Sequence, residues 1–225
     1  EVDALLLRLT GGKRMPRELA QRIHLLTDGV PLHVEELTKL LLERGSLREE
    51  AGHLQVHGQL DALPLAASPG ESVQQRLEGM ERSGARLGRQ VAQLGAAVGR
   101  SFSQALIERL WDGAPDQLEQ GLQQLVDSEL LQRQPLGETK RYVFKHALVQ
   151  EAAYQLLDGA ARAGVHGRIA QALRELQPEW LKRQPETLAL HHTGAGQIDA
   201  AIPLWLAAAD RAIEGSAHAV ALAYV

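Results

Sequence analysis

Residues 28–40 read Asp-Gly-Val-Pro-Leu-His-Val-Glu-Glu-Leu-Thr-Lys-Leu, and this stretch decides how the first part of the chain folds. A helical pattern ends at Gly29, and a second one begins at Pro31. Glycine suits the left-handed residue past a helix end, and proline suits the first helical position, where its missing N–H costs no hydrogen bond. The second helix is amphipathic, with apolar residues on one side and Glu36 and Lys39 on the other. The stretch therefore predicts a helix–turn–helix corner.

The composition of the 225-residue chain favours helical packing. The chain is 44% hydrophobic but only 4% aromatic, which is typical of Leu/Ala-rich helices and not of a sandwich built on aromatic strands. A net charge of −4 argues against nucleic-acid binding, which normally needs a basic excess. The absence of cysteine excludes disulfides and thiolate metal sites. No apolar run approaches the roughly 20 residues that span a bilayer, so we expect a cytoplasmic protein without membrane contact.

Apolar periodicity predicts an all-α chain with two small β-hairpins. Residues 1–45 form a helical module, and residues 46–69 form a short hairpin followed by a linker with two prolines. Residues 70–146 combine helices with a terminal hairpin, which is typical of a winged helix. Residues 147–225 form a helical bundle that leads into hairpins of tetratricopeptide-like type. The chain begins without methionine and ends inside an apolar helical pattern, so we expect it to be part of a longer protein.

Motifs for catalysis or metal binding are lacking. Gly12-Lys13 has neither the spacing nor the Ser or Thr of a P-loop, so we interpret it as a loop. The adjacent Glu35 and Glu36 point about 100° apart on a helix, and we interpret them as a solvated helix face. No GxSxG elbow is present. Two histidine pairs lack a third metal ligand: His53 with His57, and His191 with His192. We expect no catalytic residue and no metal site.

The terminal hairpin of the winged-helix pattern is the candidate for DNA contact, because Lys140, Arg141 and Lys145 lie there. The sequence that would supply the recognition helix, residues 115–129, has four acidic and no basic residues. DNA phosphates would repel such a helix. A winged helix that packs against protein is the better interpretation, with DNA binding as an alternative.

Six segments, taken in order, resemble one family. They are DGVPLHVEELTKLLLERGSL (28–47), LGAAVGRSF (94–102), LEQGLQQLVDSELL (118–131), YVFKHALVQEAAYQLL (142–157), HGRIAQAL (166–173) and PETLALHHTGAGQIDAAIPLWLAAADRA (185–212). Together they resemble bacterial signal-transduction ATPases with numerous domains, in which an ATPase core precedes tetratricopeptide-like repeats. Many members carry a class III adenylyl or guanylyl cyclase domain or a transcriptional output domain. The resemblance covers almost the whole chain, and residues 61–84 depart from it most.

The resemblance implies that residues 1–45 are the helical lid of a nucleotide-switch ATPase whose P-loop core lies upstream. In such proteins the proline of the Gly-x-Pro corner packs against adenine, and this role would fall to Pro31. A winged-helix histidine contacts the β-phosphate of ADP, and the matching residue is His146. An imidazole N–H at a helix start can donate to a phosphate. The alternatives are a plain helix-start proline and a helix-capping histidine without a ligand.

Residues and resemblance together predict a regulatory chain that is not itself an enzyme. It would couple the ADP or ATP state of the upstream core, with Mg²⁺ in the full protein, to an output domain. This chain alone is not expected to bind nucleotide tightly. Its partners would be that core and a protein bound by the helical repeats. The alternatives are an interaction scaffold without nucleotide coupling and a DNA-binding regulator.

Overall fold

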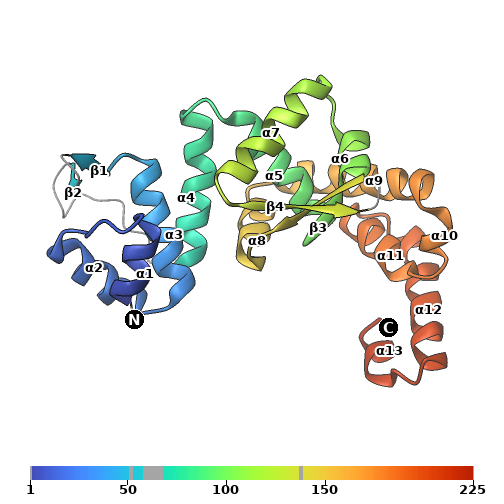
Figure 1. Cartoon of the computed structure of the whole chain (residues 1–225). Helices are drawn as coiled ribbons and strands as arrows, with labels where there is room; N and C mark the ends of the chain where they lie inside the picture. Colours follow the sequence, from blue (N-terminus) through green and yellow to red (C-terminus); the bar gives the residue numbers. More distant parts are fainter. Residues whose placement is uncertain (1, 51–52, 58–67, 137–138, 225) are drawn as a thin grey trace.

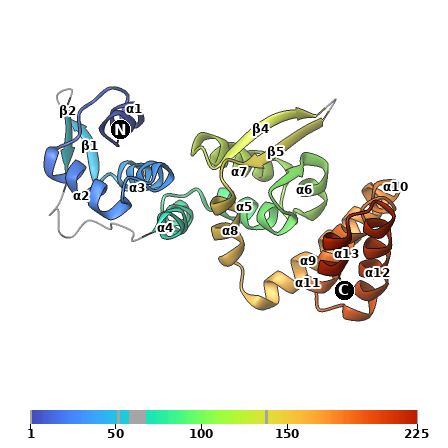
Figure 2. The ribbon, with the colours of Figure 1, turned by 90° about the horizontal axis from the view of Figure 1, so that it is seen from below.

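The computed structural model describes residues 2–50, 53–57, 68–136 and 139–224, and it is mostly helical. The described residues form 13 helices and two small antiparallel sheets, which confirms the predicted all-α class with small β elements. In both views the chain progresses along one long direction, with the N-terminal helices at one end and the C-terminal helices at the other (Figures 1 and 2). Among the described residues, no helix is long and apolar enough to cross a membrane.

Three helices and a hairpin form the first unit: α1 (Val2–Leu9), α2 (Arg17–Thr27), α3 (Pro31–Glu43), β1 (Leu47–Glu50) and β2 (His53–Val56). The corner forms as predicted, because Gly29 has a φ of 70° and Pro31 is the first residue of α3. This unit has its own apolar core, made by Leu6, Leu19, Ile23, Val34, Leu37, Leu40, Leu41, Leu47 and Leu54.

The second unit contains seven elements: α4 (Pro69–Arg82), α5 (Arg86–Val98), β3 (Ser101–Ser103), α6 (Gln104–Leu110), α7 (Pro115–Asp127), β4 (Leu131–Leu136) and β5 (Thr139–Phe144). The strands pair antiparallel in the order β3-β5-β4, and the order of elements from α5 to β5 is typical of a winged helix. Strand β3 is not predictable from the sequence, because three residues are too few to show alternation. Phe102 of β3 is buried and stacks on Tyr142 of β5, with ring centroids 5.8 Å apart.

The predicted linker lies outside the described residues up to residue 67. Its last two residues, Ser68 and Pro69, belong to the start of α4. Pro69 is the first helical residue, and the Ser68 hydroxyl accepts a hydrogen bond from the backbone N–H of Glu71 at 3.2 Å. A serine cap before a helical proline is a strong helix start.

Six helices complete the chain: α8 (Ala147–Gln155), α9 (Gly159–Leu176), α10 (Pro178–Leu181), α11 (Pro185–Gly194), α12 (Ile198–Glu214) and α13 (His218–Tyr224). The four-residue α10 was not predicted. A second apolar core runs without interruption from Val73 of α4 to Leu188 of α11. The winged helix and the helices after it therefore pack as one body.

Helices α5 and α7 approach closely at Gly121 of α7. A Cβ atom at this position would lie 2.8 Å from Val91 Cγ2 and 2.9 Å from the carbonyl oxygen of Leu87. Both neighbours belong to α5, and a backbone oxygen cannot turn away as a flexible side chain does. The absence of a side chain at Gly121 thus sets the distance between the two helices.

We predict that Gly121→Ala lowers the free energy of unfolding by about 1–3 kcal/mol, because an extra methyl group overpacks this contact. Gly164→Ala is the matched control, since Gly164 lies in α9 and a Cβ there would have no neighbour within 4 Å. The control should be neutral or stabilising by up to about 1 kcal/mol. Urea unfolding followed by circular dichroism measures both. Equal stabilities of the two variants would contradict the close approach.

Buried histidines join α9 to α11. The Nδ1 atoms of His166 and His191 lie 2.8 Å apart, and His166 Nε2 lies 2.8 Å from the Tyr154 hydroxyl. His192 instead contacts Arg174 and Gln197 through its two ring nitrogens. Burial, together with smaller effects of the neighbouring rings of His166 and His192, lowers the pKa of His191 to about 4. Burial also lowers the pKa of His166, with Arg162 adding to the effect.

We predict that stability falls as the pH drops from 7 to 4. The pKa of His191 is lower in the folded state than in the unfolded chain, so the unfolded chain binds a proton first as the pH falls. The contribution of neutral His191 to the free energy of unfolding is therefore complete above pH 6.5 and is lost toward pH 4. The loss from His191 is about 3 kcal/mol. In urea unfolding at each pH, His191→Asn should show a smaller fall than wild type, whereas the exposed His218→Asn should follow wild type. A His191→Asn profile parallel to that of wild type would contradict this role.

Candidate functional site

The charged side of α3 is buried against the second unit. Glu36 is only 1% exposed, and Glu35 is partly buried. The interpretation of these two residues as a solvated face is therefore wrong, because partners that are distant in sequence cover them. Eight residues form what we call the α3 charge cluster: Glu35, Glu36, Lys39 and Glu43 of α3, Arg76 of α4, Glu129 between α7 and β4, and Lys145 and His146 between β5 and α8.

Arg76 is the centre of one half of the cluster and is 2% exposed. Its Nη1 donates to Glu36 Oε2 at 2.5 Å, and its Nε donates to Glu43 Oε2 at 2.9 Å. Its Nη2 also donates to the carbonyl oxygen of Ser128, at the end of α7, at 2.7 Å. Burial disfavours the charged guanidinium, but the two carboxylates outweigh it and raise the pKa of Arg76. Arg76 thus connects α3, α4 and α7 as a permanent cation.

Two lysines and two glutamates form the other half. Lys39 Nζ lies 2.8 Å from Glu35 Oε1 and 2.5 Å from Glu129 Oε2, and Lys145 Nζ lies 2.7 Å and 2.9 Å from the same two oxygens. Burial alone would raise the pKa of Glu35, but hydrogen bonds from Lys145 and Lys39 outweigh it and lower the value to about 2. The same lysines lower the pKa of Glu129 to about 2. Both carboxylates are therefore ionised at neutral pH.

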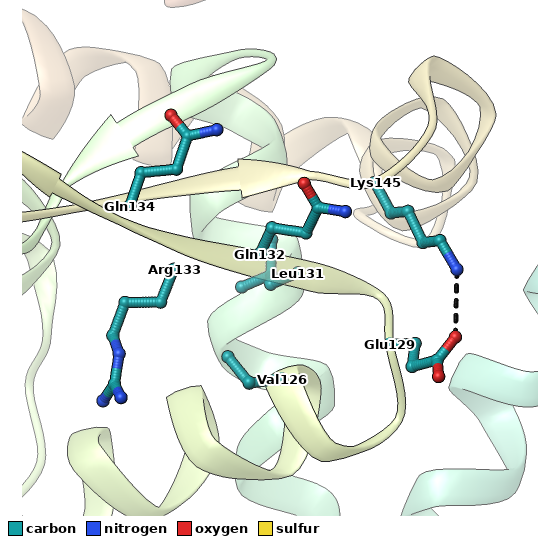
Figure 3. A pocket seen from close by; sticks show the side chains of 7 residues that line it. All are labelled: Val126, Glu129, Leu131, Gln132, Arg133, Gln134 and Lys145. Carbon is teal, nitrogen blue, oxygen red and sulfur yellow. Dashed lines mark hydrogen bonds and ion pairs between the residues drawn. The ribbon is translucent and has the colours of Figure 1, made fainter.

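A pocket of about 610 Å³ lies beside the Lys145–Glu129 pair. Figure 3 shows that pair at one end of the pocket, with Gln132 and Gln134 along β4 and Val126 beneath the strand. The apolar part of the lining consists of Leu131, which is buried, and Val126, which is half-buried, and the other lining side chains are long and polar. It contains neither Pro31 nor His146, and we assign no ligand to it.

The structure brings His146 to the helix that begins with Pro31. Pro31 is exposed at the start of α3, one turn before Glu35. His146 immediately precedes α8, and its Nε2 is buried without a hydrogen-bond partner among the described residues. A ring nitrogen of His146 and one carboxylate oxygen each of Glu35 and Glu36 all lie within 4.8 Å of one another. The side chain of His146 is therefore directed to α3 and does not cap α8.

Glu35, Glu36 and His146 are the only three residues in the described part of the chain close enough together to hold a metal ion. This group is not predictable from the sequence, because His146 is distant in sequence from both glutamates. Both carboxylates already accept hydrogen bonds from cations, Glu35 from two lysines and Glu36 from Arg76. A metal ion would place further positive charge beside these three cations, so we assign no metal to the group.

Pro31 and His146, which the resemblance assigns to a nucleotide, differ in how well their surroundings suit that role. The exposed ring of Pro31 is free to pack against a planar base. His146 does not fit a phosphate in this arrangement, because the α3 charge cluster holds four carboxylates against three paired cations, and two of the carboxylates lie beside its ring. A phosphate would be repelled there. It could reach His146 only if α3 separated from the β5–α8 turn.

Two of the three basic residues at the terminal hairpin lie close to carboxylates. Lys145 belongs to the α3 charge cluster, and Lys140 Nζ lies 3.5 Å from Glu119 Oε1 of α7. Arg141 is exposed on β5. Two of the three side chains considered for DNA phosphates are thus already paired within the protein.

Comparison with known proteins adds no relative. A scan of the sequence against protein-family profiles finds no match, and a search of curated proteins finds none either. The resemblance to signal-transduction ATPases therefore rests on the six segments quoted above.

We predict that Arg76→Met lowers the free energy of unfolding by about 3–5 kcal/mol, because it leaves the buried Glu36 carboxylate without its cation. Lys182→Met is the control, since Lys182 pairs with Glu179 at the surface with its side chain 70% exposed, and loss of such a pair costs about 1 kcal/mol or less. Urea unfolding measures both. Adding Glu36→Met to Arg76→Met should recover part of the loss. Equal effects of Arg76→Met and Lys182→Met would contradict a central role for Arg76.

Proposed function

We propose that this chain is the regulatory portion of a nucleotide-switch signal-transduction ATPase. It would transmit the ADP or ATP state of an upstream core to an output domain in the cytoplasm. The observation that carries the proposal is the joint between the two apolar cores. The core of α1–α3 and the core of α4–α11 are separate, and the α3 charge cluster lies between them.

An interface made of charged groups, such as the α3 charge cluster, allows the two units that it joins to change their relative position. Separating two apolar faces exposes them to water at a cost that grows with area. Charged groups are instead well solvated once they separate, and polar interfaces are usual between domains that move relative to one another. The carboxylates and cations of the cluster can therefore exist paired or hydrated, which gives the joint two accessible states.

The positions of Pro31 and His146 support the same proposal. The resemblance assigns both residues to the nucleotide, and they lie on the two sides of the joint, at α3 and at the β5–α8 turn. Opening the joint would remove Glu35 and Glu36 from His146 and leave its unpartnered nitrogen free for another acceptor. Nucleotide hydrolysis and Mg²⁺ would belong to the upstream core, and α11–α13 would contact a protein partner.

An interaction scaffold without nucleotide coupling is the second candidate. It is favoured by the apolar side chains that α12 exposes, among them Ile198, Ile202 and Leu206, each about half exposed. Such a surface is typical of protein-binding helical arrays. A scaffold needs no link between nucleotide affinity and the α3 charge cluster, and this difference separates the two candidates.

We predict that Lys145→Met changes the ADP affinity of the longer protein that carries the ATPase core by about fivefold or more. If nucleotide state biases the joint, then a change in the joint must alter nucleotide affinity by the same coupling free energy, commonly about 1–3 kcal/mol. Isothermal titration with ADP measures the effect, and Lys182→Met is the surface control. Identical affinities for wild type and Lys145→Met would overturn the proposal and favour the scaffold.

A further inference from the structure

A groove of about 1030 Å³ runs between α1 and α2, away from the α3 charge cluster. Its apolar lining comes from both helices and from the loop between them: Val2, Leu6, Leu7, Met15, Ala20 and Leu25. Leu25 is 80% exposed and Leu7 is 41% exposed, so the lips of the groove offer uncovered apolar surface. An apolar surface rimmed by polar residues is the usual mark of an interaction site.

The rim of the groove is basic. Lys13, Arg14 and Arg17 line it together with one acidic residue, Asp3. Lys13 is paired with Glu49 at 2.5 Å. Arg14 and Arg17 are exposed, and neither forms an ion pair with a described residue. The groove therefore presents two free guanidinium groups beside apolar side chains, and its complement is an apolar surface with an acidic border.

Helix α12 has that complementary pattern. Ile198, Ile202 and Leu206 recur at a spacing of four, so they form one exposed stripe. Asp210 follows Leu206 at the same spacing, and Glu214 follows Asp210, so that carboxylates border the stripe. Both are exposed without an ion pair to a described residue. A helix laid into a groove is a common mode of recognition.

Helices α1 and α2, which line the groove, lie at the opposite end of the molecule from α12 in both views (Figures 1 and 2). A single copy therefore cannot bring them together, whereas two copies can. We propose that the α1–α2 groove of one copy binds α12 of a second copy, with Leu25 against the apolar stripe and with Arg14 and Arg17 facing Asp210 and Glu214. This head-to-tail contact leaves one groove and one α12 free at the ends, so assemblies larger than a dimer follow. The proposal is independent of nucleotide coupling.

Sedimentation velocity over about 1–100 µM, the range of weak interfaces, tests the contact. We expect self-association that weakens with added salt, because the ion pairs are screened. Arg14→Glu with Arg17→Glu, and separately Asp210→Lys with Glu214→Lys, should each weaken it by about tenfold or more. Leu25→Ser should also weaken it. The control, Arg141→Glu with Arg183→Glu, makes the same charge change at exposed sites elsewhere and should leave it intact.

Mixing the two charge-reversed variants gives the sharpest readout. Each variant alone should be monomeric, but the unaltered α12 of the first fits the unaltered groove of the second. The mixture should therefore associate at concentrations at which neither variant associates alone. A wild-type chain that stays monomeric over the whole range would overturn the proposal. So would loss of association in the control, or a mixture that remains monomeric while both variants keep wild-type circular dichroism.

Discussion

The arrangement of this protein depends on one buried arginine. Arg76 is almost fully excluded from water, and its guanidinium contacts two carboxylates of α3 and the carbonyl that ends α7. A buried cation is tolerated only where its charge and its N–H groups are matched. Here the match needs α3, α4 and α7 in one relative position. The charge of Arg76 therefore specifies how the first unit sits on the second, although apolar packing stabilises each unit internally.

Lys145 and Lys39 fix the positions of two turns relative to α3. They share Glu35 and Glu129, which come from α3 and from the turn before β4. The pairs are partly exposed, so each contributes less than the Arg76 contacts. These pairs matter mainly for orientation. They hold the β5–α8 turn, and with it His146, against α3. A change that pulls α3 away would alter both halves of the cluster together, which is the behaviour a two-state joint requires.

Local patterns in the sequence were enough to predict the helices and the corner at Gly29 and Pro31, since these depend on periodicity, capping and backbone preference. Two elements, β3 and α10, were not predicted. They have three and four residues, which is too few to show an apolar periodicity. The charge cluster could not be predicted, because Arg76 and Lys145 lie far from α3 in sequence. One signal was present: the polar side of α3 carries Glu36, Lys39 and Glu43 at helical spacing. The same pattern is also typical of a solvated helix face. Only the partners that are distant in sequence distinguish a solvated face from a buried charged interface.

The most direct test of the joint is a distance measurement across it. The chain has no cysteine, so spin labels can be placed at Glu18→Cys on α2 and Gln120→Cys on α7, two exposed positions on either side of the cluster. Electron double resonance should give one narrow distance distribution, which broadens or shifts in Lys145→Met. A second pair, Gln120→Cys with Arg183→Cys, lies within the body formed by the winged helix and the helices after it, and its distance distribution should not change. An unchanged distribution for the first pair in Lys145→Met would contradict the account, because the ion pairs of Lys145 would then have no part in holding α3 against the β5–α8 turn.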